Sequence, residues 1–595
     1  MKKQDVIIVA LLLVLLLAWP MIYTRLFPPP PQSPAVTGPT NAPVQAAAPI
    51  QTAPATPPAA VDMMADAPAL TSPPPKPAAP PAPRAPEQIE ILRNDKMALT
   101  FSSYGAGIVS AELLNYRQST TEKSPPVLLN FSNSPALIYN GVLEIDGNTD
   151  FEMQYDPATP DVIRFEKTSA AGWKFIRTYT LVENYQVDVV DVFTNAGTAP
   201  LALPEHEIQL GYMSGIASAS RAGEYLYLGV DALQSVGGEG VVYWAKKIPK
   251  IFSAAKSSDS PYLPASINQY QPEPVDWVAA KNKFFVQLLV PARENTGSAY
   301  RVLAQRKLIP GEQQNPALSP RKAEIAAVSS AMVFPSMTIR PGDSLEFRLR
   351  YYAGPKKFSI LRLLGMKQEE VMEFGMWSPV CKFLLKVLNT TYKLIPNYGV
   401  AIIILTILIR ILFWPLTHKS TESMKKMQAL QPLMMEIREK YKDNPQKMQT
   451  ETMELYRKHK VNPMGGCLPM LIQIPVFIAL FVVLRSAIEL RFAEFLWIKD
   501  LSEPERLLAD ILPIPLNILP IIMAVTMAWQ QKLTPTADSS QQRMMMVFMP
   551  VMMLVMFYMM PSALVLYWTT NQCIMIAQQL VNKKRTALKA AGTAA

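Results

Sequence analysis

The sequence predicts a membrane α-helical bundle of six spans, five of which form one core, together with an all-β exported domain and a cytoplasmic helical hairpin. Apolar runs near the roughly 20 residues that cross a bilayer occur once at the N-terminus and five times in the last third of the chain. Between them, residues 88–355 alternate apolar and polar side chains with the period of a β-strand. The composition is segregated too, because 20 of the 55 prolines lie between Pro28 and Pro86, and 20 of the 32 methionines lie between Met424 and Met575. Neither clustering suits a single globular enzyme.

The N-terminal apolar run predicts an uncleaved membrane anchor over residues 1–27. Val6 to Tyr23 carries no charge and follows two lysines, and its end lacks the small residues of a signal-peptide cleavage site. Residues 28–87 are rich in proline and alanine and have no periodic apolar face. A chain of this composition cannot bury a core, so we expect a disordered linker that tethers the anchor to the next domain.

Residues 88–355 predict an all-β sandwich. Short alternating runs are separated by turn residues, as in LEIDGN, where we expect a turn at Asp146-Gly147. The runs from Trp173 to Leu181 and from Tyr185 to Phe193 predict adjacent strands joined by a short turn. A domain of this length buries enough apolar surface to fold without disulfides.

Five further apolar runs predict the membrane core within residues 397–582. The last two are separated only by Pro561 and must form a tight hairpin. Both are near the lower limit of span length, which suggests a thin or distorted bilayer around them. The five predicted spans are 397–416, 468–484, 511–529, 544–560 and 562–578.

Lysine and arginine in the short loops predict the orientation, because such residues stay on the cytoplasmic side. Residues 417–464 carry ten of them and the basic tail 583–595 carries four, whereas the loop from Arg485 to Asp510 carries four against six acidic residues. Both termini and the 417–464 loop are therefore expected in the cytoplasm, with the β domain exported. Topology explains most of the net charge of +10, which makes a nucleic-acid patch the weaker interpretation.

The loop at 417–464 predicts a charged helical hairpin. A KDNP turn at 442–445 separates a first helix from a second one over Gln446 to Lys458. The first helix carries an apolar stripe at helical spacing, made of Met424, Met427, Leu430, Met434, Ile437 and Tyr441. A methionine stripe usually packs as core, but exposed thioethers would also suit contact with varied apolar peptides. A separate amphipathic stretch at 377–394 is expected to lie in the exported membrane interface.

Metal and nucleophilic chemistry have no local support. Cys381, Cys467 and Cys573 are far apart, without a CxxC pair or a histidine at ligand spacing, so neither a disulfide framework nor a zinc site is indicated. Nucleotide-binding, acyl-transfer and metalloprotease motifs are missing. No pair of carboxylates in the β domain can be nominated as acid and base from spacing. The sequence therefore nominates no catalytic residue and no metal ligand.

Arg410 is the one charge inside the run AIIILTILIRILFWPL. A charge near the middle of a span costs about 2.5 to 3.5 kcal/mol on insertion scales. Two interpretations stay open: the side chain snorkels to the cytoplasmic headgroups past Leu416, or it lies in a polar cavity with Thr406, one turn earlier on the same helical face. Other predicted spans could contribute polar groups to such a cavity, namely Gln473, Asn517, Thr569, Thr570, Asn571 and Gln572.

Several ordered motifs resemble the bacterial YidC membrane protein insertase family. They are the run around Arg410, LQP at 430–432, VNPMGGCLPMLIQIPVF at 461–477, FMPVMM, and PSALVLYW at 561–568. The resemblance covers the whole architecture and is strongest over residues 377–582. The anchor and large exported domain resemble the Gram-negative type, whose periplasmic domain is a β supersandwich related in fold to sugar mutarotases.

The resemblance implies an inner-membrane insertase and chaperone that needs no cofactor and is not an enzyme. Arg410 and Thr406 match residues of the family's hydrophilic groove. Gln473 and Asn571 are further candidates for this groove, because they are polar residues within apolar runs. Phe477 and Trp568 match positions that contact the substrate helix, although a tyrosine often stands at the second. The implied partners are nascent membrane proteins, the SecYEG and SecDF translocon, the ribosome and membrane lipids; the short tail weakens the case for the ribosome.

Two other classes compete with the insertase. A secondary transporter would explain buried polar residues, but the sequence has no paired repeat of interrupted helices. A membrane-anchored cell-wall enzyme would place the activity in the β domain. Deletion of residues 90–350 should then abolish function, whereas an insertase core should retain much of it.

Overall fold

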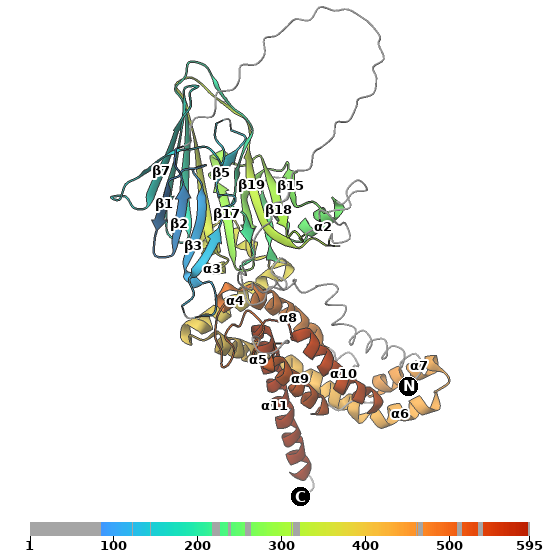
Figure 1. Cartoon of the computed structure of the whole chain (residues 1–595). Helices are drawn as coiled ribbons and strands as arrows, with labels where there is room; N and C mark the ends of the chain where they lie inside the picture. Colours follow the sequence, from blue (N-terminus) through green and yellow to red (C-terminus); the bar gives the residue numbers. More distant parts are fainter. Residues whose placement is uncertain are drawn as a thin grey trace, which may run out of the picture. The chain divides into compact units, whose positions relative to one another are not determined.

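The computed structural model describes two regions of regular structure, a β domain and a set of helices (Figure 1). The predicted anchor and most of the predicted linker lie outside the described residues. The described residues are 85–592 except 122, 143, 217–226, 236–239, 256–262, 311, 313–319, 321, 460, 462–467, 509–514 and 534–538.

The β domain is built from stacked antiparallel sheets, as the alternating sequence predicts. Within the described residues, nine strands form the largest sheet, in the order β14 (Val241–Tyr243), β13 (Gly229–Gln234), β16 (Val275–Lys281), β17 (Phe285–Pro291), β21 (Ser344–Pro355), β9 (Gln186–Asn195), β8 (Trp173–Leu181), β7 (Val162–Thr168) and β6 (Glu152–Tyr155). A second sheet has the order β15 (Ser266–Gln271), β18 (Ala299–Arg306), β19 (Ile325–Phe334), β11 (His206–Gln209) and β5 (Ile138–Asn140), and β12 (Met213–Ser214) also pairs with β19.

Two smaller sheets and one short helix complete the domain. The first small sheet has the order β1 (Ile89–Arg93), β2 (Met97–Ser102), β3 (Ile108–Arg117) and β4 (Pro126–Asn130). The second pairs β10 (Leu201–Leu203) with β20 (Met337–Ile339), and α2 (Ile248–Ala254) is the short helix. The strands from β1 to β21 run from Ile89 to Pro355.

The strand pair predicted around Asn184 is confirmed. β8 begins and ends where the alternation does, and β9 pairs with it so that Leu181 is opposite Val187. Every second residue of β8 is buried, which places one face on the core. Asn184 and Tyr185 have φ of 58° and 66°, the left-handed conformation that a tight hairpin turn requires.

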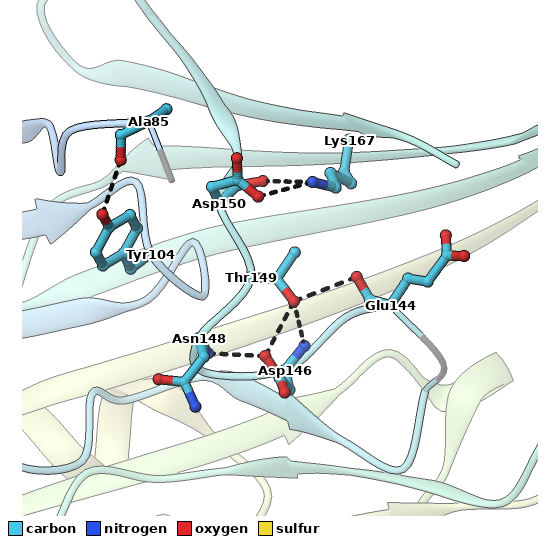
Figure 2. Close-up of polar contacts among 8 residues, drawn as sticks. All are labelled: Ala85, Tyr104, Glu144, Asp146, Asn148, Thr149, Asp150 and Lys167. Carbon is cyan, nitrogen blue, oxygen red and sulfur yellow. Dashed lines mark hydrogen bonds and ion pairs between the residues drawn. The ribbon is translucent and has the colours of Figure 1, made fainter. Parts of the chain in front are cut away.

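The predicted turn at Asp146 is also confirmed. The Asp146 carboxylate accepts from the backbone N–H of Asn148 at 2.8 Å, and the Thr149 hydroxyl donates to the Glu144 carbonyl at 3.2 Å (Figure 2). The Asp146 carboxylate thus stabilises the turn by binding the backbone N–H two residues further along the chain. A single bridge joins Val142 to Ile145, and none of the described residues 144–148 belongs to a named strand.

A buried ion pair lies between the sheets of the β domain. Arg177 on β8 and Asp191 on β9 are directly opposite, and two N–H···O bonds of 2.7 Å join them. Tyr139 donates to the same carboxylate at 2.8 Å, and the Arg177 guanidinium also donates to the Leu137 carbonyl. Neither partner is exposed to solvent. The hydrogen bonds offset the cost of removing both charges from water.

The helical region begins directly after β21. Its helices are α3 (Phe358–Leu364), α4 (Ser378–Leu394), α5 (Tyr398–Ala429), α6 (Gln431–Lys440), α7 (Pro445–Lys458), α8 (Leu468–Ser486), α9 (Ile518–Leu533), α10 (Ser539–Phe557) and α11 (Ser562–Gly592). The stretch predicted as an interfacial helix at 377–394 is α4, which packs its buried residues Cys381, Leu384, Leu385 and Leu388 against α5 and α8.

Several helix boundaries differ from the predicted spans. α9 begins at Ile518, whereas the predicted span begins at residue 511; residues 511–514 lie outside the described residues. α10 ends at Phe557, and α11 continues to Gly592, well past the predicted end at 578. Residues 558–561, which include Pro561, separate α10 from α11.

The first helix of the predicted hairpin is divided. α5 continues through Pro415 to Ala429, so Met424 and Met427 lie on the same helix as the predicted span 397–416. Leu430 interrupts the helix between α5 and α6. Pro432 lies in the first turn of α6, the position where proline fits a helix. α6 and α7 then pack on each other, and the Tyr456 hydroxyl donates to the Met434 sulfur at 3.0 Å.

Among the described helices, one passes a test of length and hydropathy for a membrane span. It covers Tyr398–Pro415, with a mean hydropathy of 2.1, and shorter apolar helices cover Gln473–Ser486 and Val547–Phe557. The six-span arrangement therefore stays a prediction.

Candidate functional site

Polar side chains from four helices meet where α11 packs against α5, α8 and α9. Because residues four apart share a helix face, Tyr567 and Asn571 of α11 point the same way. We call the set the polar cluster, which consists of Arg410, Gln473, Thr526, Tyr567, Asn571 and Gln572.

Arg410 contacts α11 within the cluster. Its Nε donates to the side-chain oxygen of Asn571 at 2.6 Å. Asn571 is only 8% exposed, whereas Arg410 is half-buried. In the described residues, neither terminal nitrogen of this guanidinium makes a hydrogen bond or an ion pair with another side chain. The two terminal nitrogens of the guanidinium are therefore available to bind another group.

Two further bonds tie α11 to its neighbours. Gln473 of α8 donates to the Tyr567 hydroxyl, and Thr526 of α9 donates to Gln572 at 3.0 Å. Sequence reasoning nominated the two glutamines but missed Thr526 and Tyr567. A threonine in an apolar helix usually bonds its own backbone, so no local signal marked Thr526.

The other nominated polar residues lie apart from this contact. Thr406 is fully buried and its hydroxyl donates to the Ile402 carbonyl at 2.7 Å. Thr569 donates likewise to Val565. Asn517 donates to the Tyr558 carbonyl at 2.6 Å and accepts from the Arg506 N–H at 2.7 Å, so it fixes the start of α9.

The two nominated aromatic residues contact each other. The Phe477 and Trp568 rings are 5.2 Å apart at 82°, an edge-to-face pair. Phe557 of α10 packs on Trp568 at 5.3 Å. Phe477 and Trp568 are both half-buried, and the buried Trp568 indole N–H has no hydrogen-bond partner in the described part of the chain.

Exposed apolar side chains surround this site. On α5 the fully buried face holds Ala401, Ile402 and Leu405, whereas Ile411 and Leu412 are 62% and 65% exposed. The same outward face holds Ile407, Leu408 and Trp414, and α9 and α10 expose Ile521, Ile522, Val525, Trp529, Val547 and Val551. A patch of this extent on several helices is unfavourable in water and fits contact with lipid.

The apolar stripe predicted for the hairpin is partly buried where the structure describes its side chains. Met427 and Met434 are half-buried, and Met434 contacts Tyr456 of the partner helix. The methionines that the α6–α7 pair exposes are Met435 and Met453, at 57% and 56%. Period-based reasoning missed both because they stand outside the stripe.

The β domain holds a cavity of about 210 Å³ between β4 and the segment Tyr212–Ile216. No group of three or more histidine, cysteine or acidic side chains in the described residues could hold a metal ion.

Comparison with known families covers both regions. Residues 90–388 match the model of the YidC periplasmic domain, and residues 390–589 match that of the 60Kd inner membrane protein. These matches define an inner-membrane protein with a periplasmic domain. The chain belongs to the YidC family of membrane protein insertases.

Curated relatives agree along most of the chain. The membrane protein insertase YidC of Citrifermentans bemidjiense is 33% identical over 508 residues, which cover 83% of this chain and 85% of that protein. The protein of the same name from Geotalea uraniireducens is 30% identical over 607 residues, with 98% and 99% covered.

Solved structures are less similar. A YidC insertase crystal structure is 20% identical and covers 83% of this chain and 94% of its own, with a TM-score of 0.33. A galactose mutarotase-like protein from Lactobacillus casei covers 45% of this chain and all of its own, at 8% identity and a TM-score of 0.29.

Proposed function

We propose that this protein inserts and helps to fold membrane proteins, and that the polar cluster lines a water-filled groove that receives the polar part of the incoming chain. The observation that carries the proposal is Arg410, half-buried among apolar helices and bonded to a neutral side chain at one nitrogen. A lone charge inside hydrocarbon is costly and typically marks a functional site.

The groove shortens the distance over which a hydrophilic segment of the substrate must cross hydrocarbon without water. A hydrophilic segment loses its hydrogen bonds to water when it enters hydrocarbon, which costs several kcal/mol for each unpaired group. Arg410 and the hydroxyl and amide groups beside it replace some of those bonds. The free edge of the guanidinium attracts an acidic side chain of the passing segment and binds it with two hydrogen bonds.

The apolar helix of the substrate leaves along the aromatic pair. Phe477 and Trp568 stand beside the cluster and are half-buried. Their rings offer a flat apolar contact between the groove and the lipid-facing surface of α5 and α9. Substrate helices are thereby held until they partition into the bilayer, which is the chaperone part of the proposal.

The proposal also covers the orientation of the chain in the membrane and the partners of the protein. The excess of lysine and arginine at 417–464 and 583–595 favours a cytoplasmic location for α6, α7 and both termini. The exposed Met435 and Met453 then lie where a nascent chain arrives. SecYEG, SecDF and the ribosome are the partners that the family resemblance proposes.

Reconstitution tests the proposal directly. The purified chain in lipid vesicles should insert a single-span protein made by a ribosome, and a photoreactive amino acid at position 477 or 568 should crosslink to its apolar helix. Arg410→Ala should reduce insertion most for substrates with acidic exported segments. Equal insertion of all charge variants by Arg410→Ala would contradict the electrostatic part, and empty vesicles performing as well as loaded ones would contradict the function.

A further inference from the structure

Asn571 gives Arg410 a neutral partner, unlike the buried arginines of the β domain. Arg177 is held by the carboxylate of Asp191, and Arg306 by that of Glu312. At Arg410 the acceptor is the carboxamide oxygen of Asn571. No acidic side chain in the described residues forms an ion pair with Arg410.

The choice of a neutral acceptor has an electrostatic consequence. A carboxylate in this place would cancel the positive charge and could bind the guanidinium through two nitrogens, as Asp191 binds Arg177. A carboxamide fixes one nitrogen, Nε, and leaves the net charge in the site. Because Asn571 is 8% exposed and lies on a helix packed against α5, its oxygen is a fixed point for the arginine.

The remaining polar groups of the cluster bind one another and do not compete for the hydrogen bond between Arg410 and Asn571. The Tyr567 hydroxyl accepts from Gln473, and Gln572 accepts from Thr526. Those bonds tie α11 to α8 and α9, which sets the rotation of α11 and the place of Asn571 one turn after Tyr567.

We propose that Asn571 is a positioning residue that holds Arg410 by Nε and keeps its charge unpaired, so that the free terminal nitrogens select substrates whose exported segments carry carboxylates. This inference rests on the proposed insertase function. It assigns selectivity for acidic segments to the pair rather than to the arginine alone.

The test measures selectivity rather than activity. The full-length chain is reconstituted in vesicles and given two single-span substrates that differ only in the exported segment, which carries aspartates in one and asparagines in the other. The readout is the ratio of acidic to neutral substrate inserted. Asn571→Asp nearly preserves the shape of the side chain and should lower the ratio by roughly tenfold, close to the ratio of Arg410→Ala, since a charge-assisted bond is lost.

Two further variants separate positioning from damage to the fold. Asn571→Ala keeps the charge but frees the guanidinium, and should lower the ratio by only a few fold. Asn517→Asp alters another buried asparagine, outside the cluster; it should change the insertion of both substrates equally and leave the ratio unchanged.

The outcomes distinguish this inference from the function on which it rests. A fallen ratio in Asn571→Asp with an unchanged ratio in Asn517→Asp supports the positioning role. If the unaltered chain inserts both substrates and neither Asn571→Asp nor Asn571→Ala changes the ratio, the positioning role is overturned and the insertase function stands. If the unaltered chain inserts neither substrate, the insertase function itself fails.

Discussion

Lys283 of the β domain forms a buried ion pair with Glu503 in the loop between α8 and α9, with 2.5 Å between Nζ and Oε1. Lys283 also donates to the Ser502 carbonyl at 3.2 Å. The Glu503 carbonyl in turn accepts from the N–H and the hydroxyl of Ser562, the first residue of α11. The pair thus links the β domain to the helix that carries Asn571.

Lys283→Met should destabilise the chain by about 3 to 5 kcal/mol, because it leaves the Glu503 carboxylate buried without its partner. Adding Glu503→Leu should recover much of the loss. Thermal unfolding of the full-length chain in detergent measures both effects. Lys382→Met is the matched control: its pair with Glu370 is partly exposed, so its removal should cost less than about 1 kcal/mol. Equal losses from the two lysine variants would contradict the prediction.

Asp191→Ala should be among the most damaging single changes in the β domain. It leaves the Arg177 guanidinium with no ion-pair partner in a site closed to solvent, at a cost of about 3 to 5 kcal/mol. Tyr139→Phe removes one hydrogen bond to the same carboxylate and should cost about 1 kcal/mol. Urea unfolding in detergent, followed through the loss of β structure, compares them. A similar loss in both variants would show that the ion pair carries little of the stability.

Strands, turns and helix ends that depend on neighbouring residues could be predicted from the sequence. The strands β8 and β9 follow from strict alternation and from Asn184, which tolerates the left-handed turn. The division of the hairpin at Leu430 could have been predicted as well, because Pro432 fits the first turn of a new helix.

The site was predicted only in part, for a physical reason. Arg410, Gln473 and Asn571 stand out as polar residues in apolar runs, and that signal is local. Which of them touch depends on the rotation of α11 against α5 and α8, which one sequence does not contain. The bond from Arg410 to Asn571 and the role of Tyr567 as acceptor therefore emerged only from the packed helices.

Lys356 predicts a pH dependence of stability. It is buried beside Lys281, Asp231, Glu373 and Arg485, and burial lowers the pKa of its ammonium group from 10.5 to about 7. The unfolded chain binds this proton more tightly than the folded one, so the stabilising contribution is complete above pH 10.5 and is lost as the pH falls through about 7.

Lys356→Met should flatten that slope. The melting temperature of the full-length chain in detergent, measured between pH 7 and 10, should rise with pH by less in the variant than in the unaltered chain. The neighbouring Asp231 does not mask the effect, since burial raises the pKa of its carboxyl to about 6, and its own contribution is lost as the pH rises from 3.8 through 6. Parallel curves for the variant and the unaltered chain would contradict the assignment to Lys356.

Trp568 should act through the shape of its ring rather than through its N–H. The indole nitrogen is buried and has no hydrogen-bond partner among the described residues, whereas the ring packs on Phe477 and Phe557. Trp568→Phe keeps an aromatic contact, so we expect insertion by the reconstituted chain to fall by no more than about twofold. Trp568→Ala removes two aromatic pairs worth about 0.5 to 1.5 kcal/mol each and should reduce insertion by roughly fivefold or more. The substrates with neutral exported segments serve here, because they isolate the apolar contact from the charge of Arg410. If Trp568→Phe were as defective as Trp568→Ala while both retained the melting temperature of the unaltered chain, the indole N–H would have to bind the substrate directly.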